Sequence, residues 1–387
     1  MEKKRYVALD ILRGMTVACM ILVNNPGGKA FAPLRHAEWH GCTPTDLVFP
    51  FFLFIVGAAM AFSFAKFSQG LSAPAIKKLV IRGFLIFATG FLLQAFPFYP
   101  LSPKPDLSWG ANYLNYLNNL RVFGVLQRIG LAYILGGFLA IWLQKPKRIA
   151  WGAITVLLLH WVTLYLFGGD DPYSKEGNIS GQIDVWIVGK SHVYKGFGLP
   201  FDPEGLLGVL SAAGTVLLGY LAGGLIRRDK PKIDTVGLLY TISLVCIGLG
   251  IIWGIWLPIN KPLWTGSYVL YTAGWSTLLL AFFIYLTDVV GSIGKFSFEK
   301  LLFPFKALGA NPLFAFVMAG ILARIARIFA WQAGESKITF LQWFNRHVVI
   351  AIFGNNEVGS LVYSLCYVSV FTLMAIFLYR KKIFIRL

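Results

Sequence analysis

The sequence has few charged residues for its length. Only 13% of its 387 residues are Asp, Glu, Lys or Arg, whereas a soluble globular domain carries about 25%. Hydrophobic residues make up 57%, and repeated apolar stretches reach the roughly 20 residues that a helix needs to cross a bilayer. The short alternating segments of a membrane β-barrel are absent. The composition therefore excludes an ordinary soluble domain and predicts an all-α, polytopic transmembrane helical bundle.

Cysteines and metal-binding motifs are also scarce. The four cysteines, Cys19, Cys42, Cys246 and Cys366, have no CxxC spacing, and three of them lie in apolar runs. A disulfide framework or a thiolate metal site is therefore not expected. The sequence has no HExxH motif, no Gly-rich phosphate loop and no Asp/His metal spacing. We expect neither a metal cofactor nor nucleotide hydrolysis.

Acidic residues are about half as frequent as basic ones, 17 against 35, which gives a net charge of +18. The basic residues fall in short clusters beside the apolar runs, for example within 77–82, 145–148 and 227–232. That placement is typical of a topology signal, so we expect contact with a lipid bilayer and no nucleic-acid partner. Both ends of the chain are basic, which predicts cytoplasmic termini.

Apolar length and flanking turn residues predict about ten spans in a single membrane domain, 1–387. The even number agrees with two termini on one side. Long loops at 168–204 and 329–359 are expected on the periplasmic side, and an exposed apolar span face could form a homodimer. The predicted spans are 6–24, 45–66, 76–97, 121–143, 149–167, 205–226, 235–257, 266–287, 305–328 and 360–380.

Polar side chains gather in the hairpin between the first two apolar runs. Asn24 ends the first run, and Asp46 begins the second. His36 can take up a proton near neutral pH, since imidazole has a reference pKa of about 6.5. Trp39 and His40 follow it, and Asp46 or Asn24 could fix its tautomer. Asp46 could instead only cap a helix, and His36 could be a loop histidine in contact with water.

Charged residues inside the apolar runs form further clusters. Asp10 and Arg13 share one face of the first span, and Arg121, Gln127 and Arg128 enter the fourth. A charge at mid-bilayer costs roughly 3 kcal/mol on insertion scales, so such residues usually pair or line a cavity. An Asp10–Arg13 pair that only locks helices together is the alternative, and Arg121 could be an interfacial anchor.

Three weaker signals lie later in the chain. Asp202 and Glu204 precede the sixth span, where acids are also favoured as helix caps. Asn311 precedes Pro312 inside the ninth predicted span, and such a step frees backbone groups, often beside a cavity. Trp264 precedes the eighth span and could contact substrate or belong to an interfacial aromatic belt.

Six segments of the chain stand out: LDILRGMTVACMILVN, HAEWHGCTPTDLVFPFFLFIVG, LRVFGVLQRIGLAY, FDPEGLLG, NKPLWTGSYVL and YRKKIFIRL. Together they resemble the transmembrane acetyltransferases typified by heparan-α-glucosaminide N-acetyltransferase. The resemblance runs nearly end to end, and the long HAEW…DLVFP…G block is its most specific part. No counterpart of the animal enzyme's extra lumenal domain is evident, so the chain looks like a bacterial member in the inner membrane.

The resemblance implies that cytoplasmic acetyl-CoA donates an acetyl group to the amine of a glucosamine-type sugar or oligosaccharide on the periplasmic side. The family's active-site histidine matches His36, and its nearby asparagine matches Asn24. The buried arginine of LQR matches Arg128, and the acid of DPEG matches Glu204.

The expected chemistry assigns roles to these residues. His36 acts as general base or carries the acetyl group covalently, Asn24 donates to the oxyanion, and Asp46 orients His36. We expect acetyl-CoA to contact Arg13, Arg121, Gln127, Arg128 and Asn311, and the sugar to contact Trp39, His40, Asp202, Glu204 and Trp264. A transporter of a sugar or anionic metabolite is the main alternative, because intramembrane charges and Pro-broken helices also mark transport paths. An enzyme for lipid-linked sugars, or for another acyl group, is a third.

Overall fold

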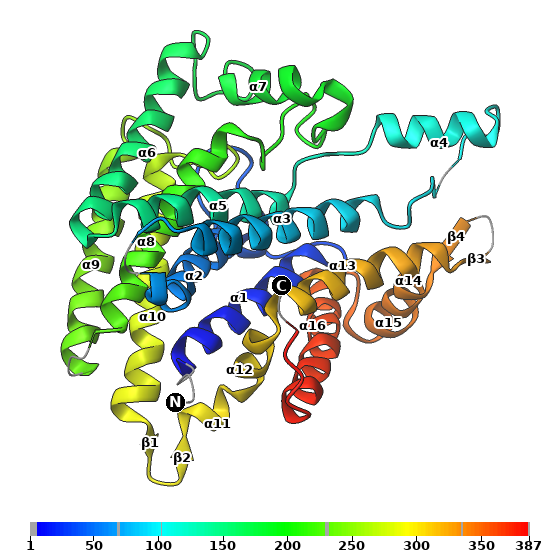
Figure 1. Ribbon diagram of the computed structural model, residues 1–387. Helices are drawn as coiled ribbons and strands as arrows, with labels where there is room; N and C mark the ends of the chain where they lie inside the picture. The colour runs from blue at the N-terminus through cyan, green and yellow to red at the C-terminus, as the bar shows by residue number, and fades with distance from the viewer. Residues whose placement is uncertain (1–5, 68–69, 102, 229–231, 334–335, 386–387) are drawn as a thin grey trace.

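The computed structural model of the protein describes residues 6–67, 70–101, 103–228, 232–333 and 336–385 (Figure 1). Within these residues helices dominate, and the strands form only two short antiparallel hairpins. The all-α prediction is therefore confirmed. Residues 2–5 and Lys230, which belong to the basic clusters that predict the topology, lie outside the described residues.

The elements follow the chain in a simple order. The α-helices are α1 (Val7–Asn24), α2 (Val48–Ser63), α3 (Ala73–Ala95), α4 (Trp109–Asn118), α5 (Val125–Leu143), α6 (Pro146–Phe167), α7 (Ile179–Val188), α8 (Leu207–Ile226), α9 (Lys232–Trp253), α10 (Gly266–Ile284), α11 (Phe298–Leu301), α12 (Phe303–Ala310), α13 (Pro312–Ile328), α14 (Phe340–Phe344), α15 (Ile350–Phe353) and α16 (Glu357–Arg380). The strands are β1 (Ser292–Ile293), β2 (Phe296–Ser297), β3 (Ala330–Ala333) and β4 (Ser336–Thr339). Short 3₁₀ or π segments are η1 (Ala32–Leu34), η2 (Pro44–Leu47), η3 (Ala65–Phe67), η4 (Lys190–His192), η5 (Tyr285–Val290) and η6 (Asn345–Val349).

Eight helical segments among the described residues are long and apolar enough to cross a membrane, and a bent pair adds a ninth. α3 occupies the predicted span 76–97 but is not one of them, and its first turns hold Lys77, Lys78 and Arg82. The eight segments are Val7–Asn24, Pro44–Ser63, Val125–Leu143, Pro146–Phe167, Leu207–Ile226, Lys232–Trp253, Gly266–Val290 and Glu357–Arg380.

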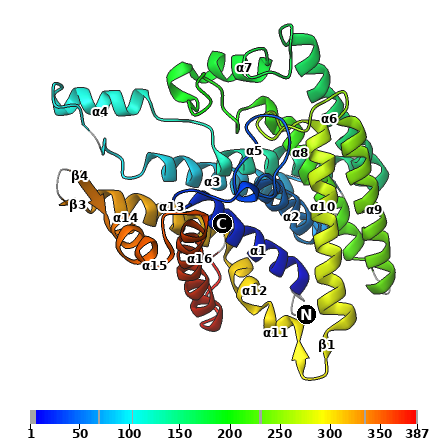
Figure 2. The ribbon, with the colours of Figure 1, turned by 180° about the vertical axis from the view of Figure 1, so that it is seen from behind.

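The predicted span 305–328 consists of two helices, α12 and α13, that meet at the Asn311–Pro312 step. The chain bends by 85° between α12 and α13. Asn311 leaves the helical region at the bend, with φ −131° and ψ 52°. Pro312 explains the break, because it donates no backbone hydrogen bond and its ring disfavours helical geometry at the preceding residue. As a result, α13 leads away from α9 and α10 toward α14 and α15 (Figures 1 and 2).

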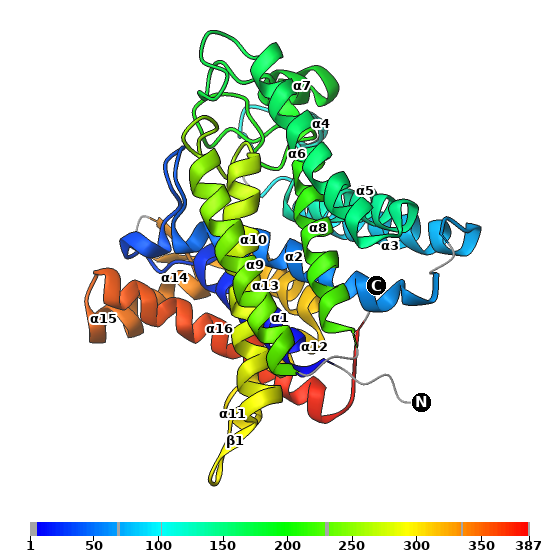
Figure 3. The ribbon, with the colours of Figure 1, turned by 90° about the vertical axis from the view of Figure 1, so that its left-hand side faces the viewer.

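Glycines bring the central helices close together. A side chain at Gly219 of α8 would come within 2.0 Å of the Phe54 carbonyl oxygen of α2. Gly14 of α1 packs as tightly on the Phe305 backbone of α12. Small residues drive helix association in membranes because they allow such close backbone contact. α9 packs beside α10 (Figure 3), and its outer face exposes Leu244, so it suits lipid or a second copy of the chain. A homodimer stays a prediction.

The membrane topology also stays a prediction. α7, from the 168–204 loop expected outside, lies with α4 at one end of the bundle, and the β1–β2 hairpin lies at the other (Figure 1). In a variant with Cys366 replaced, a cysteine introduced at Lys190 should react with a membrane-impermeant reagent added outside intact cells. A cysteine at Lys147 should react only after the membrane is opened. The reverse pattern would overturn the prediction.

Candidate active site

The hairpin between α1 and η2 is held by the loop before α10. The Gly41 amide donates to the Ile259 carbonyl oxygen at 2.7 Å, and Gly41 pairs with Asn260 in an isolated β-bridge. The Asn260 side chain, which is fully buried, donates to the Trp39 carbonyl oxygen at 3.0 Å. Because of this docking, the segment just before Gly41 lies against the segment just after Asn260.

His36 and Asp46 meet within this hairpin. His36 Nδ1 lies 2.6 Å from Asp46 Oδ1. The His36 side chain is 53% exposed, whereas that of Asp46 is 1% exposed. The prediction that Asp46 orients His36 therefore has a direct geometric basis. Asn24 is not one of the hydrogen-bond partners of His36 in the described structure.

Asp46 is also a helix cap, so the two roles considered for it coexist. Its Oδ2 accepts from the Ala37 amide at 3.0 Å and from the Thr43 amide at 3.1 Å. The Thr43 hydroxyl donates to the same oxygen at 3.0 Å. The Tyr268 hydroxyl donates to the Asp46 backbone carbonyl at 2.6 Å. With this many donors, the carboxylate is fixed in place and stays an acceptor.

Lys261 is the third member of the cluster, and the sequence prediction missed it. Its Nζ lies 3.2 Å from Asp46 Oδ1 and 3.0 Å from His36 Nδ1. It stands in NKPLWTGSYVL, a segment of the family resemblance, but 225 residues separate it from His36. Only the docking of the hairpin on the loop before α10 brings the two together.

This arrangement fixes the imidazole for proton transfer. A carboxylate only accepts hydrogen bonds, so the 2.6 Å contact assigns a proton to His36 Nδ1. Lys261 has no acceptor site, so with the proton on Nδ1 it donates to Asp46, and its 3.0 Å approach to Nδ1 is not a hydrogen bond. Nε2 of His36 has no hydrogen-bond partner in the described structure, and its ring is half exposed. A neutral His36 thus presents a free basic nitrogen to an incoming group.

Two cavities lie along α1. Residues of α1, α3, α5 and α13 line both, and α2 also lines the first. The first, here called the N-end cavity, has a volume of about 440 Å³. Asp10 and Arg13 line it beside Arg82 and Tyr133, and Ile385 also faces it. Arg13 Nη1 donates to Asp10 Oδ1 at 3.0 Å, so the predicted pair forms and also lines a cavity.

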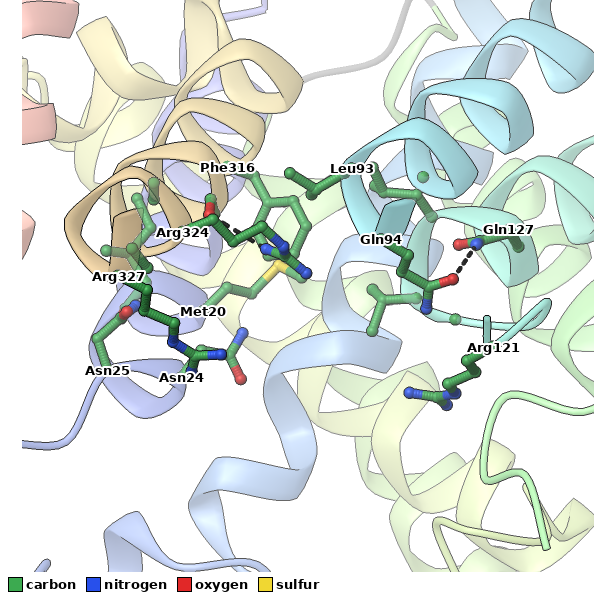
Figure 4. Close-up of a pocket in the computed structure, with 18 residues that line it drawn as sticks. Met20, Asn24, Asn25, Leu93, Gln94, Arg121, Gln127, Phe316, Arg324 and Arg327 are labelled. Carbon is green, nitrogen blue, oxygen red and sulfur yellow. Dashed lines mark hydrogen bonds between the residues drawn. The ribbon is translucent and has the colours of Figure 1, made fainter. Parts of the chain in front are cut away.

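The second, the C-end cavity, has a volume of about 340 Å³ (Figure 4). Asn24 and Asn25 line it at the end of α1, with Gln94 and Gln127 opposite. Gln127 Nε2 donates to Gln94 Oε1 at 2.8 Å. Asn24 thus lines this cavity, and its contact with the oxyanion stays a prediction.

Arg121 joins this cavity to the segment before α8. Its Nε and Nη2 bind both carboxylate oxygens of Asp202, at 2.9 and 2.6 Å, and Nη2 also binds Glu204 at 2.5 Å. Burial alone would lower the pKa of Arg121, but the bonds to the two acids raise it above its ordinary value. The predicted residues Arg121, Asp202 and Glu204 therefore form one ion cluster and hold each other in place.

Arg128 is buried beside that cluster and lines neither cavity. It is 1% exposed, its Nη2 donates to the Gly205 carbonyl oxygen at 2.9 Å, and its guanidinium lies 5.2 Å from the Trp264 ring centre. Trp264 is equally buried, and its indole N–H donates to Thr215 at 3.2 Å. Contact of Arg128 with acetyl-CoA, and of Trp264 with substrate, stay predictions.

Three other predicted site residues have structural partners. Trp39 donates to the Tyr173 carbonyl oxygen at 2.7 Å and packs in a buried aromatic cluster with Phe201. His40 Nδ1 lies 3.3 Å from the Asn260 amide nitrogen. Asn311 donates to the Ile383 carbonyl oxygen and accepts from the Ile385 amide. Their roles in binding stay predictions.

Asp184 of α7 is a buried acid that the sequence prediction missed. It is fully buried; its Oδ1 accepts from the Leu206 amide at 2.8 Å, and its Oδ2 has no partner in the described structure. Burial raises the pKa of Asp184 to about 7, against about 3.9 in an unfolded chain. The folded state therefore binds the proton more tightly, and the free energy of unfolding falls as the pH rises from about 4 to about 7.

Replacing Asp184 should remove this pH dependence. Between pH 5 and pH 7.5, the melting temperature of the wild type should fall by about 2–4 °C more than that of Asp184→Asn. Thermal unfolding in detergent measures this, with Asp170→Asn, at an exposed position, as the control. Parallel pH curves for wild type and Asp184→Asn would contradict the interpretation.

The chain is similar to known proteins over almost its full length. A family model described as "Heparan-alpha-glucosaminide N-acetyltransferase, catalytic" matches residues 5–171, which include the hairpin with His36 and Asp46. The chain is 28% identical to heparan-α-glucosaminide N-acetyltransferase of Mus musculus over 438 aligned positions, and 27% identical to the Homo sapiens protein over 435. The chain is therefore similar to that family. The alignments cover 98% of the chain and 60% and 59% of the two relatives, so the chain spans about three fifths of their length.

These similarities to heparan-α-glucosaminide N-acetyltransferases confirm the resemblance predicted from the sequence. The matched region holds α1, the His36 hairpin, α3 and α5, and thus three of the four helices that line both cavities. Lys261 and α13 lie outside the region that the family model matches, but within the alignments to the two relatives.

Proposed function

We propose that the chain transfers an acetyl group from cytoplasmic acetyl-CoA to the amine of a glucosamine-type sugar on the periplasmic side of a bacterial inner membrane. The observation that carries the proposal is the His36–Asp46–Lys261 cluster, which leaves His36 Nε2 free. It lies in a chain whose relatives are named as N-acetyltransferases. The proposal covers this chain only and does not include the additional length of those relatives.

The two cavities suit a reaction whose substrates arrive from opposite sides. The N-end cavity has a volume within the range of about 300–1,000 Å³ that is typical of ligand sites. Its mixed lining suits acetyl-CoA, because Arg13 and Arg82 can contact phosphates, while Leu9 and Ile86 offer apolar contact to the carbon chain. The C-end cavity lies further along the same four helices and holds Asn24, next to the hairpin that bears His36.

The residues of the chain account for each step of the transfer. His36 Nε2 takes a proton from the attacking amine as the N–C bond forms, Asp46 stabilises the imidazolium, and Lys261 keeps Asp46 ionised. Asn24 donates its side-chain N–H to the oxyanion. The C–S bond then breaks, CoA leaves as the thiol, and His36 returns a proton to the sulfur. A route in which His36 carries the acetyl group is the alternative.

Radiolabelled acetyl transfer from acetyl-CoA to glucosamine, in detergent-solubilised protein, tests the proposal. Product should form with the wild type and not with heat-inactivated protein. The paired cavities also suit a transport path for a sugar or anion, which is the second candidate function. A pure transporter would form no acetylated product and would instead move labelled sugar into proteoliposomes.

A further inference from the structure

Tyr268, in the first turn of α10, connects the helical core to Asp46. Its side chain is fully buried, and its hydroxyl donates to the Asp46 backbone carbonyl at 2.6 Å. In the described structure, the other hydrogen-bond partners of Asp46 are residues of its own hairpin, together with Lys261. Hairpin residues move with Asp46 and cannot fix its place relative to the helices. Of its partners, only Lys261 and Tyr268 come from another part of the fold, and both belong to one short segment.

The Asp46 carbonyl needs a donor from outside its own helix. In a continuous helix, the amide four residues further along the chain would donate to it. That position is Pro50 of α2, which has no backbone N–H. A buried carbonyl without a partner is costly, and the Tyr268 hydroxyl supplies the missing hydrogen bond.

The turn before α10 holds Lys261 and Tyr268 in a fixed relation. The Trp264 amide donates to the Lys261 carbonyl oxygen at 3.0 Å, and the Thr265 amide to that of Asn260 at 3.1 Å. Trp264 has a φ of 55°, a left-handed conformation that a bulky residue adopts rarely and at a cost in free energy. Such a backbone persists only where its surroundings hold it, and strain of this kind clusters at functional sites.

The Trp264 ring packs against Tyr268. The two rings meet edge to face, with their centres 5.3 Å apart and an angle of 80° between their planes. Phe49 of α2 packs on the same indole at 4.8 Å, and the indole N–H donates to Thr215 of α8. Aromatic pairs favour this edge-to-face geometry. Contacts from α2, α8 and α10 therefore fix the rings that present the Tyr268 hydroxyl.

We propose that Tyr268 is a positioning residue for the transfer: it holds Asp46 where the carboxylate orients His36. The inference rests on the proposed function, in which His36 takes the proton of the amine. Tyr268 acts through Asp46 rather than on the substrate, because its one hydroxyl proton is bound to the Asp46 carbonyl. Without this bond, the backbone of Asp46 shifts, and the carboxylate moves with it relative to His36.

Tyr268→Phe tests the proposal, because it keeps the ring and removes only the hydroxyl. It should lower the turnover number about 10- to 100-fold, since a misplacement of about 1 Å can cost 10²-fold. KM for acetyl-CoA should stay unchanged, since Tyr268 lines neither cavity. Steady-state kinetics measure both. Wild-type turnover by Tyr268→Phe would overturn the proposal.

Thr277→Val is the matched control. It removes another buried hydroxyl from α10, one that donates to the Ala273 carbonyl oxygen at 2.7 Å, and it keeps the shape of the side chain. Turnover should stay at the wild-type level, because this hydroxyl has no contact with the hairpin. Thermal melts of all variants in detergent establish that they are folded.

A double-mutant cycle separates positioning from a general loss of structure. In the His36→Ala background the general base is already gone, so Tyr268→Phe should lower the remaining transfer little further. A general effect on the fold would instead lower turnover by the same factor in both backgrounds. Equal factors would therefore overturn the proposal.

The reactivity of His36 gives a readout that does not need acetyl transfer. Diethyl pyrocarbonate modifies neutral imidazole, and mass spectrometry of the detergent-solubilised protein reports each histidine separately. His36 of the wild type should react faster than His347, which is also exposed but lies beside the Trp343 carbonyl oxygen instead of an acid. The Asp46 carboxylate makes the free nitrogen of His36 the better nucleophile.

Tyr268→Phe should remove most of this excess reactivity, whereas Thr277→Val should keep it. An unchanged ratio of His36 to His347 modification in Tyr268→Phe would overturn the proposal. If no acceptor is acetylated but the ratio falls in Tyr268→Phe alone, the proposed reaction is wrong and the positioning of Asp46 by Tyr268 stands.

Discussion

His36→Ala should lower the turnover number for acetyl transfer by at least about 10²-fold, the low end for a lost general base. The variant removes the only group in the His36–Asp46–Lys261 cluster with a free basic nitrogen. Its effect on folding should be small, since the His36 side chain is 53% exposed and contributes little packing. Steady-state kinetics with acetyl-CoA and an amino sugar, beside a thermal melt, measure both quantities.

His40→Ala is the control for this experiment. His40 is exposed in the same hairpin, but its contact is with Asn260 rather than with an acid, so its loss should lower turnover far less. Near-normal transfer by His36→Ala would remove His36 from the chemistry under either route.

The same variant separates the two routes. Protein incubated with labelled acetyl-CoA alone and then quenched should retain label only if His36 carries the acetyl group. Label on the wild type and none on His36→Ala supports the covalent route. No label on either, together with normal transfer by the wild type, supports direct attack of the amine.

Asp46→Asn should reduce turnover by about 10²–10⁴-fold, the second large effect. The asparagine has no charge to stabilise an imidazolium. Its NH₂ group would also take the place of one carboxylate oxygen and so face groups that are themselves hydrogen-bond donors. In Ser–His–Asp triads the same replacement leaves the geometry intact but fixes the wrong imidazole tautomer, at a loss of about 10⁴-fold. Here it also leaves Lys261 without its carboxylate, 3.2 Å away in the wild type.

Asp46→Asn should also destabilise the fold, so a control is needed that weakens the cap and the hairpin contact of Thr43 with Arg35 but keeps the Asp46 carboxylate. Thr43→Ala removes the hydroxyl that donates to Asp46 Oδ2 but keeps the Thr43 amide bond to it. Its melting temperature should fall, since losing a cap costs about 1 kcal/mol, while turnover stays close to that of the wild type. If Asp46→Asn lost no more turnover than Thr43→Ala, Asp46 would be a cap only.

The sequence predicts what depends on local pattern. Apolar length alone places most membrane helices, and the His36–Asp46 contact joins residues only ten positions apart. Lys261 is not predicted, because a lysine in a loop has many ordinary explanations and its partner lies 225 residues away. Asn311 and Pro312 indicate a break in the ninth span, but the 85° angle depends on how α12 packs against α1.

Arg324 and Arg327 illustrate the same difference. At the end of an apolar helix, arginines normally indicate the edge of the bilayer, and nothing in the local pattern distinguishes these two. Only the folded chain shows that both arginines line the C-end cavity, with Gln94 of α3 and Gln127 of α5 opposite them. Arg121 and Glu204 were each predicted as site residues, but their pairing across 83 positions required the folded chain.

The bend at Asn311 makes the position of α13 depend on the segment around Ile385 near the end of the chain. α13 lines both cavities, yet it begins at a bend where Pro312 donates no backbone hydrogen bond. The Asn311 side chain ties that bend to Ile383 and Ile385, at 3.0 and 2.8 Å, and Ile385 itself lines the N-end cavity. In a mutational scan, positions near Ile385 should therefore behave like positions of the active site, although no catalytic group lies among them.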